Sequence, residues 1–306
     1  MRAFTVVIAL WVLAGTTFAE DLPEIHSKAM VVLDAETGAE IHGKAADEIR
    51  PIASTTKIFV AMVVRKRNLS LDDWTQITRV DVAAARGGAR TRLGVRESFR
   101  NRDLLRAMLI SSDNRAPTAL GRAVGLDPQA LVAAMNKLAK ELGLAKTRFV
   151  DPTGLRGNQS TAREMALALR VALDDKVLRD IMGTPEATII SKDRSLRVDY
   201  HTTNVPLAAS KYRITGGKTG FTTPAGYCYI TGAELAGRKV VLAFFGAPGK
   251  MSRFEDFNRV AAWLERGAPG ARLAGSTDSA GQRPKREPAS EDAPPRRRER
   301  ARVAHP

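Results

Sequence analysis

Strand-like apolar segments at both ends of the chain constrain its fold more than any other feature. Residues 28–34 predict a buried strand, and residues 40–42 predict the returning strand of a hairpin. Residues 226–232 and 239–245 predict a second hairpin far along the chain. The segments between the hairpins favour helices. This order predicts one sheet assembled from the two ends of the chain, with a mostly helical insertion packed against it.

Capping signals mark the starts of three longer helices. Asp127, followed by a proline, predicts a helix start before apolar residues at helical spacing. Thr161 and Glu164 predict a capping box and a helix through about residue 174. Ser252 and Glu255 predict another capping box and a helix that ends near residue 266. Shorter helices are expected over residues 104–110 and near residue 116.

The two termini differ from the rest of the chain. Arg2, an apolar run of residues 3–14 and a small residue at position 19 predict a signal peptide over residues 1–19. The run is short for a membrane span, although an uncleaved anchor remains the alternative. Residues 267–306 have almost no large apolar residues and predict a disordered, basic, Pro/Arg-rich tail. The folded domain is therefore expected over residues 20–266, in a protein exported to the periplasm or cell wall.

The net charge of +15 and the single cysteine limit the partners and the cross-links. A basic surface favours polyanionic partners. For an exported protein we expect an anionic wall or membrane surface, bound through the tail, and not nucleic acid; charge that serves solubility alone is the alternative. Cys228 is the only cysteine, so an intramolecular disulfide is excluded, and we expect it to be a small buried apolar residue.

Three short motifs with chemically useful side chains occur in order along the chain. They are Ser54-Thr55-Thr56-Lys57, Ser112-Asp113-Asn114 and Lys218-Thr219-Gly220. Each is weak alone, but their order and spacing together are a strong signal. Class A β-lactamases and penicillin-binding proteins share this trio.

The first motif predicts a serine nucleophile beside a lysine base. Ser54 opens an apolar helical stretch, and residues three apart on a helix are neighbours, so Lys57 is expected beside Ser54. The helix N-terminus would offer backbone N–H groups to an oxyanion. A serine hydroxyl needs a base, and Lys57 qualifies only if burial and nearby cations lower its pKa. The alternative is a capping serine with a surface lysine one turn later.

The second motif predicts groups that handle the proton and the substrate. Ser112 is expected to relay a proton between Lys57 and the leaving amine. Asn114 is expected to hold a substrate carbonyl or Lys57 itself, whereas Asp113 points away and fixes the loop. The alternative is an ordinary turn between helices, for which these residues are common.

The third motif predicts a substrate-binding strand. Its glycines, including Gly220, leave room for a peptide along the strand edge. Lys218 and Thr219 suit a terminal carboxylate or the corresponding amide, and Lys218 is expected to help depress the pKa of Lys57. The alternative is a glycine-rich turn between strands.

With these motifs the chain resembles the low-molecular-mass penicillin-binding proteins of the D-alanyl-D-alanine carboxypeptidase family (peptidase S11). The resemblance runs from about Ile25 to Arg266 and is closest to the D,D-endopeptidase branch. Residues 50–54 (RPIAS), 147–155 (TRFVDPTGL), 160–163 (STAR) and 218–222 (KTGFT) also carry it. Many carboxypeptidase relatives have histidine where this chain has Phe221, and a second β-rich domain with a membrane anchor. Both differences favour the endopeptidase branch.

The resemblance implies a fold and a mechanism. The fold is α/β (α+β) and β-lactamase/transpeptidase-like: about five antiparallel strands flanked by helices, plus a helical subdomain bearing Ser112 and Asn114. Ser54 attacks the carbonyl of the penultimate D-alanine of a peptidoglycan stem peptide, and backbone N–H groups near Ser54 and on the Lys218 strand hold the oxyanion. Water then releases the acyl group. β-Lactams acylate Ser54 and leave slowly, and no cofactor or metal is implied.

Four other functions are weighed against this one. A D-alanyl-D-alanine carboxypeptidase that trims pentapeptides remains open. A class A β-lactamase is disfavoured because the chain lacks the Glu-x-x-Leu-Asn sequence that carries the deacylating glutamate in those enzymes. Glu164 lacks the following Leu-Asn, and Asp151 lies at about the right distance along the chain but in a predicted turn. A zinc peptidase is disfavoured because the four histidines are scattered without metal-ligand spacing. A non-catalytic wall-binding protein is disfavoured by the intact trio.

Overall fold

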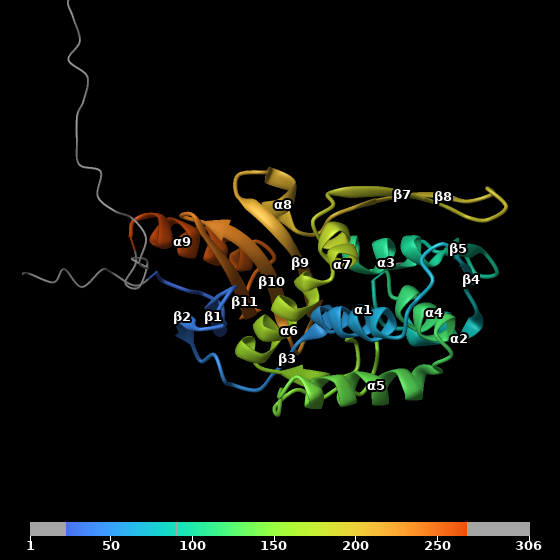
Figure 1. The fold of residues 1–306 in the computed structure, drawn as a ribbon, viewed down its shortest axis with the longest axis horizontal. Coiled ribbons are helices and arrows are strands. Elements are labelled where there is room, and N and C mark those ends of the chain that lie inside the picture. The colour runs from blue at the N-terminus through green and yellow to red at the C-terminus, as the bar shows by residue number, and fades with distance from the viewer. Residues whose placement is uncertain (1–22, 90, 268–306) are drawn as a thin grey trace, which may run out of the picture. The chain divides into compact units, whose positions relative to one another are not determined.

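A five-stranded antiparallel sheet joins the two ends of the chain (Figure 1). Its strands are β1 (Ala29–Asp34), β2 (Glu40–Lys44), β9 (Arg213–Thr222), β10 (Gly226–Leu235) and β11 (Arg238–Ala247). The computed structural model describes residues 23–89 and 91–267, so the predicted signal peptide and nearly all of the predicted tail lie outside it. The strand order is β2-β1-β11-β10-β9. The predicted sheet from both chain ends is thus confirmed.

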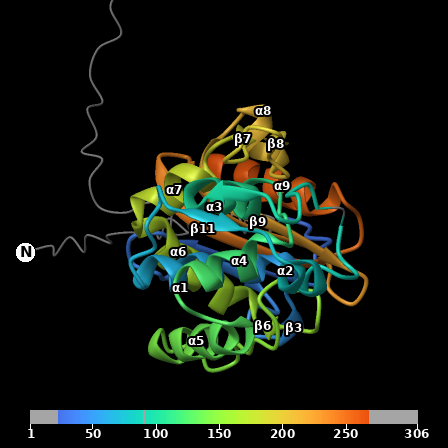
Figure 2. The same ribbon diagram turned by 90° about the vertical axis from the view of Figure 1, so that its right-hand side faces the viewer.

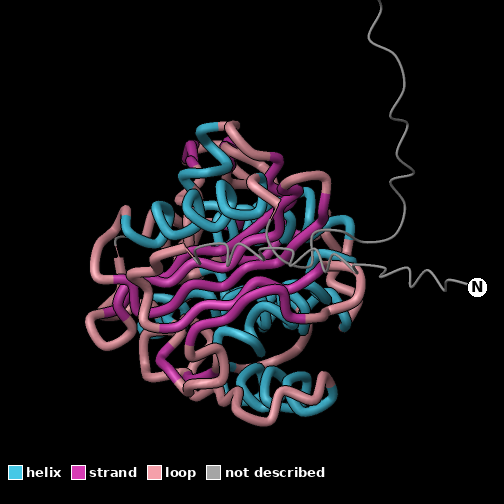
Figure 3. The backbone as a smooth tube through the Cα atoms, turned by 90° about the vertical axis from the view of Figure 1, so that its left-hand side faces the viewer, coloured by secondary structure: helices cyan, strands magenta, loops and turns pink. Residues whose placement is uncertain are grey.

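Both faces of this sheet are buried, which explains the continuous apolar run of β1. Val31 and Leu33 point toward the helical insertion. Met30 and Val32 point the other way and belong to a core that includes α9 (Ser252–Glu265). A strand buried on both faces reads as an unbroken apolar segment, without the alternation of a half-exposed strand. Figure 3 shows the strands side by side, with helices around them.

The helical insertion is built around α1 (Lys57–Lys66), whose first eight residues are all buried. Its neighbours are α3 (Asn101–Ile110), α4 (Ala116–Ala123), α5 (Pro128–Glu141) and α6 (Ala162–Asp174), and α6 also packs on the sheet. The other helices are η1 (Ala53–Thr56), α2 (Arg79–Ala84), α7 (Lys176–Met182) and α8 (Val205–Ala209). Figures 1 and 2 show α1 to α5 grouped together beside the sheet. In the described part of the chain, no helix is long and apolar enough to span a bilayer.

Three short strand pairs complete the fold. They are β3 (Arg50–Pro51) with β6 (Gln159–Ser160), β4 (Trp74–Gln76) with β5 (Ser98–Arg100), and β7 (Glu186–Ile190) with β8 (Arg197–His201). The β7–β8 hairpin, which was not predicted, lies along α3 (Figure 1). Only alternate residues of β8, Val198 and Tyr200, are buried. The hairpin therefore has one face on the body of the protein and one face in solvent.

The helix starts test the predicted caps. Asp127 caps α5, since its carboxylate accepts from the backbone N–H of Ala130 at 2.8 Å. Thr161 caps α6 as predicted, but the Glu164 carboxylate accepts from the Lys146 N–H and the Thr147 hydroxyl, so the reciprocal half of that capping box is absent.

The capping box predicted at Ser252 is wrong. Ser252 is already the first residue of α9, the N-cap is Met251, and no side chain caps this helix. The Ser252 hydroxyl lies against Gly249 instead. An unpredicted capping box forms at α2, where Thr78 and Asp81 bond to each other's backbone.

Candidate active site

The Ser54 and Lys57 side chains meet at the junction of η1 and α1. The Lys57 Nζ lies 2.7 Å from the Ser54 Oγ, so the pair expected from the three-residue spacing is formed. Ser54 lies in the first turn of the helical stretch, as expected, but this turn, η1, is a 3-10 helix. The preceding residue, Ala53, has a left-handed φ of +46°. A non-glycine residue in this conformation breaks regular helical geometry, so the α-helix begins only at Lys57.

All three N–H groups of a charged Lys57 have an acceptor. Besides Ser54, the Nζ donates to Asn114 Oδ1 at 2.7 Å and to the carbonyl of Thr153 at 2.8 Å. The lysine has no exposed surface, and Ser54 is 9% exposed. The first two motifs are therefore brought together around one buried amine, with Ser54 on its accessible side.

Burial lowers the pKa of Lys57 from 10.5 to about 7. The negative charges of Asp151 and Asp113 act in the opposite direction and keep the pKa from falling further. We expected burial and nearby cations to lower this pKa: burial does so, and burial together with the repulsion between Lys57 and Lys218 lowers the pKa of Lys218. Near neutral pH, the Lys57 amine is therefore present in both its charged and its neutral form.

Two glycines allow other segments to approach the Ser54 backbone closely. A Cβ on Gly220 of β9 would lie 2.8 Å from the Ser54 nitrogen. A Cβ on Gly154 would lie 2.0 Å from the Ala53 carbonyl oxygen, and Gly154 also has a φ of +87°. Any side chain at either position would clash with backbone. The third motif thus lies directly against the first one.

The second motif forms the connection between α3 and α4. Asp113 fixes this loop as expected, since its carboxylate accepts from the Arg92 N–H, the Arg115 N–H and the Tyr200 hydroxyl. Ser112 has a left-handed φ of +65° and is partly exposed. Its hydroxyl has no hydrogen-bond partner within residues 23–89 and 91–267. Ser112 and Asn114 therefore share a loop, but within the described residues only Asn114 forms a hydrogen bond with Lys57.

Lys218 and Thr219 lie on β9 and are both buried. The Lys218 Nζ donates to the carbonyl of Thr219 at 2.7 Å, and the Thr219 hydroxyl lies 2.6 Å from that of Thr203. Burial, and then repulsion by Lys57 and Arg253, lowers the pKa of Lys218 well below its ordinary value. Nothing in the sequence marks Thr203 as part of this group.

The loop that presents the Thr153 carbonyl was also missed as part of the site. The Asp151 carboxylate accepts from the backbone N–H groups of Thr153, Gly154 and Arg156, which folds residues 151–156 into a tight turn. Asn158 anchors this turn to η1, because its amide donates to the Thr56 hydroxyl at 3.0 Å. The Asp-Pro-Thr-Gly sequence was the available signal for the turn, but a carbonyl acceptor leaves no signature of its own.

Arg253 of α9 supports β9 from behind, which the sequence did not reveal. Its guanidinium donates to the carbonyls of Gly220 and Cys228, at 2.8 Å and 3.0 Å. It also lies over the ring of Tyr227, which stacks on Phe221 with 4.3 Å between ring centroids. Phe221 itself is 50% exposed, directly after Gly220. The end of β9 therefore carries an exposed aromatic ring on the residue that follows Gly220, packed on Tyr227 on the Arg253 side of the strand.

Two further features bear on the chemistry of the site. Cys228 is buried, and burial raises the pKa of its thiol to about 12, so it is not a nucleophile at neutral pH. Within residues 23–89 and 91–267, no three His, Cys, Asp or Glu side chains form a group that could hold a metal ion.

Comparisons with known proteins place this chain in a family. A family profile described as D-alanyl-D-alanine carboxypeptidase (peptidase S11) matches residues 16–249. The chain is 31% identical over 274 residues to a D-alanyl-D-alanine endopeptidase of Escherichia coli K12, covering 88% of this chain and 87% of the relative. It is 34% identical over 245 residues to a protein of the same name from Pseudomonas aeruginosa, covering 80% and 79%.

Solved structures give the same result. The DD-transpeptidase of Streptomyces K15 superposes with a TM-score of 0.72 at 26% identity, covering 79% of this chain and 97% of that one. A penicillin-binding protein homologue from Mycobacterium tuberculosis superposes with a TM-score of 0.72 at 25% identity, covering 85% and 98%. The profile match, the identities and the superpositions show that this chain belongs to the D-alanyl-D-alanine carboxypeptidase family, peptidase S11.

Proposed function

We propose that this protein is a serine peptidase that cuts D-alanyl-D-alanine bonds in peptidoglycan through an acyl-enzyme on Ser54. Family membership supports the reaction class. The observation that carries the proposal is the environment of Lys57, a fully buried amine with a pKa of about 7 in contact with a serine hydroxyl. A general base is most effective when its pKa lies near the working pH.

The three partners of Lys57 explain how it takes the proton. A neutral amine has two N–H groups and one lone pair. The carbonyls of Asn114 and Thr153 can only accept hydrogen bonds, so they take the two N–H groups. The lone pair is left for the Ser54 hydroxyl, the one partner that can donate. Deprotonation of Lys57 therefore turns Ser54 from an acceptor into a donor, which is the arrangement a nucleophile needs.

The close contact between β9 and η1 supports the proposed oxyanion site. Because Gly220 lies against the Ser54 nitrogen, a substrate carbonyl beside Ser54 Oγ would be held between the Ser54 N–H and the backbone of β9. Donors fixed in advance at the developing negative charge stabilise the transition state strongly. A peptide substrate would lie along β9, with Lys218 and Thr219 binding its distal part.

We assign the proton relay to Ser112. Its hydroxyl is unpaired in the described part of the chain, and its left-handed backbone is held by the three hydrogen bonds of the neighbouring Asp113. A strained serine without a structural partner is typical of a residue kept for function. Ser112 would return the proton from Lys57 to the leaving amine, and Asn114 would orient Lys57.

The endopeptidase reaction is our choice over the carboxypeptidase reaction. The relatives from Escherichia coli and Pseudomonas aeruginosa are both named endopeptidases. Phe221, which is exposed and stands where many carboxypeptidase relatives have histidine, would contact the chain beyond the scissile bond. In a cross-link that chain is a second stem peptide, whereas a carboxypeptidase releases only D-alanine.

The setting follows from the same proposal. Residues 1–19 would act as a signal peptide and direct the catalytic domain, residues 20–266, out of the cytoplasm to its substrate. Residues 267–306 would bind an anionic wall or membrane surface electrostatically. β-Lactams would acylate Ser54 and inhibit the enzyme.

Muropeptide analysis tests the proposal. Residues 20–306 and the Ser54→Ala variant are incubated with sacculi that contain pentapeptide stems and D-alanine cross-links, and products are followed by mass spectrometry. Conversion of dimers into monomers before terminal D-alanine is lost supports the endopeptidase. Trimming of pentapeptides with dimers intact would make the enzyme a carboxypeptidase, and identical digests by the Ser54→Ala variant would remove Ser54 from the mechanism.

A further inference from the structure

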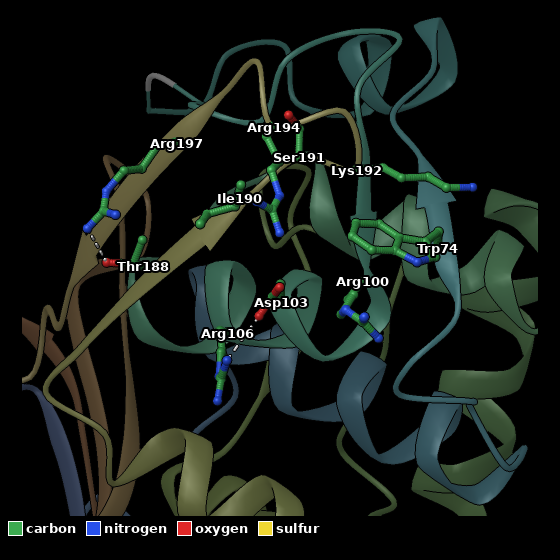
Figure 4. A pocket seen from close by; sticks show the side chains of 10 residues that line it. All are labelled: Trp74, Arg100, Asp103, Arg106, Thr188, Ile190, Ser191, Lys192, Arg194 and Arg197. Atoms are coloured by element: carbon green, nitrogen blue, oxygen red, sulfur yellow. Dashed lines mark hydrogen bonds and ion pairs between the residues drawn. The ribbon is translucent and has the colours of Figure 1, made fainter.

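A groove rich in basic side chains lies between the β7–β8 hairpin and α3, and none of its lining residues belongs to the three motifs (Figure 4). Its volume is about 630 Å³. Five of the ten lining residues are Arg or Lys and one is acidic. The charged members are Arg100, Asp103, Arg106, Lys192, Arg194 and Arg197. We call this surface the basic groove.

Two cations of the basic groove have no partner in the described part of the chain. Arg106 pairs with Asp103 at 3.0 Å, and Arg197 approaches Asp199 at 3.6 Å. Lys192 and Arg194 are both exposed, and their side chains form no hydrogen bond or ion pair within residues 23–89 and 91–267. A carboxylate or phosphate in the groove would supply what they lack, through charge-assisted hydrogen bonds.

The loop that carries these two cations is held in place. Between β7 and β8, the Asp193 carboxylate accepts from the Ser191 hydroxyl at 2.6 Å and from the Ser195 hydroxyl at 2.9 Å. The Lys192 N–H also donates to the Ser98 carbonyl, which ties the loop to β5. Figure 4 shows Arg194 reaching from the hairpin toward α3, and Lys192 extending on the side of Trp74. The loop backbone that carries the two positive side chains is therefore held in place.

Both walls of the basic groove lead to the loop of Ser112. On one side, α3 ends at Ile110, and Arg106 lies about 6 Å along the helix axis from that end. On the other side, Tyr200 of β8 donates to Asp113 at 2.9 Å. An extended pentapeptide spans about 17 Å. Lys192 bonds to Ser98 just before α3 begins, about 15 Å of helix away from Ile110, so it is a separate stem peptide of the same polymer that would reach this end of the groove.

We propose that the basic groove binds carboxylate groups of peptidoglycan stem peptides other than the one being cut. This inference rests on the proposed function, which makes peptidoglycan the polymer at the site. Stem peptides carry free carboxylates at their C-termini and on acidic residues, and they repeat along the glycan. Contacts at a second stem would add to the effective affinity for the polymer without any contact at the scissile bond.

Binding to purified sacculi tests the groove. All proteins carry the full mature chain and Ser54→Ala, so that no substrate is consumed. The Lys192→Gln/Arg194→Gln pair removes the two unpartnered cations. The control pair, Arg67→Gln/Lys250→Gln, removes one Arg and one Lys that are likewise exposed and that form no side-chain hydrogen bond or ion pair in the described residues. We expect about a fivefold loss of affinity for the groove pair and little change for the control pair.

The outcomes separate this proposal from its competitors. If both pairs lose the same affinity for sacculi, or neither loses any, the basic groove is refuted as a site. Equal losses would mean that sacculi are bound only by the overall surface charge. If the groove pair loses binding to phosphatidylglycerol vesicles but keeps its binding to sacculi, the groove binds lipid phosphate and not stem-peptide carboxylates. That result would also refute the proposal. Labelling of the same pairs with intact Ser54 by fluorescent penicillin reports the proposed function separately. If the wild-type protein is not labelled, the proposed function fails, while the binding result still decides the groove.

Discussion

The rate at which penicillin acylates Ser54 should follow the titration of Lys57. With a pKa of about 7, the neutral fraction of Lys57 is about 1% at pH 5, about half at pH 7 and about 99% at pH 9. Because only the neutral amine can take the Ser54 proton, the second-order rate constant should rise about a hundredfold over this range and level off above pH 8. A lysine at its ordinary value of 10.5 would give a rate that still rises tenfold per pH unit at pH 9.

The assay is labelling by fluorescent penicillin in a series of buffers at constant ionic strength. Lys57→Arg is the control, because a guanidinium stays charged over the whole range and cannot accept the proton. We expect this variant to lose at least about a thousandfold in rate and to show no rise with pH. A midpoint above pH 9, a rate that falls as pH rises, or a Lys57→Arg variant with near wild-type rates would refute the role of Lys57 as base.

Four further changes are predicted. Gly220→Ala places a methyl group 2.8 Å from the Ser54 nitrogen and should slow penicillin labelling at least about tenfold; unchanged labelling would contradict the close approach. Ser112→Ala should lower kcat about a hundredfold but change the free energy of unfolding by less than about 0.5 kcal/mol, and an unchanged kcat would exclude the relay. Tyr200→Phe, which removes the hydrogen bond to Asp113, should cost about 1–3 kcal/mol in urea unfolding, and a smaller loss would mean that other contacts hold the loop. Truncation after Arg266 should weaken sacculus binding at low salt without affecting labelling; unchanged binding would exclude a role for the tail.

The main sheet could be predicted because its strands are long and apolar. β1 buries all of its residues and β10 and β11 bury most of theirs, so each leaves an apolar run that is readable without knowledge of its neighbours. The β7–β8 hairpin was missed because it buries few side chains, notably Ile189, Val198 and Tyr200, between charged residues. Its strands are defined by packing against α3, and such tertiary context has little trace in five-residue segments.

The candidate site was likewise predicted only in part. The pairing of Ser54 with Lys57 follows from helical spacing, and the low pKa of Lys57 was expected from its proposed role. The third contact of Lys57 is a backbone carbonyl, that of Thr153, and a carbonyl exists at every residue. Its direction depends on the turn folded around Asp151, so only the structure could place it. The left-handed φ of Ala53 could not be predicted either, because alanine carries no sequence signal for a positive φ.

The placement of β11 between β1 and β10 sets the order in which the enzyme can assemble. Leu33 pairs with Val241, so β1 can complete its pairing only when a strand about two hundred residues later in the chain is available. Contacts of such high sequence separation raise contact order and slow folding, because a large loop must close before they form. The strand that brings Gly220 against Ser54 belongs to the same late-arriving segment. A chain that crosses a membrane N-terminus first would therefore complete its nucleophile site only after nearly all of the domain has emerged, and a chain cut short before β11 would leave β1 as an unpaired apolar edge open to aggregation.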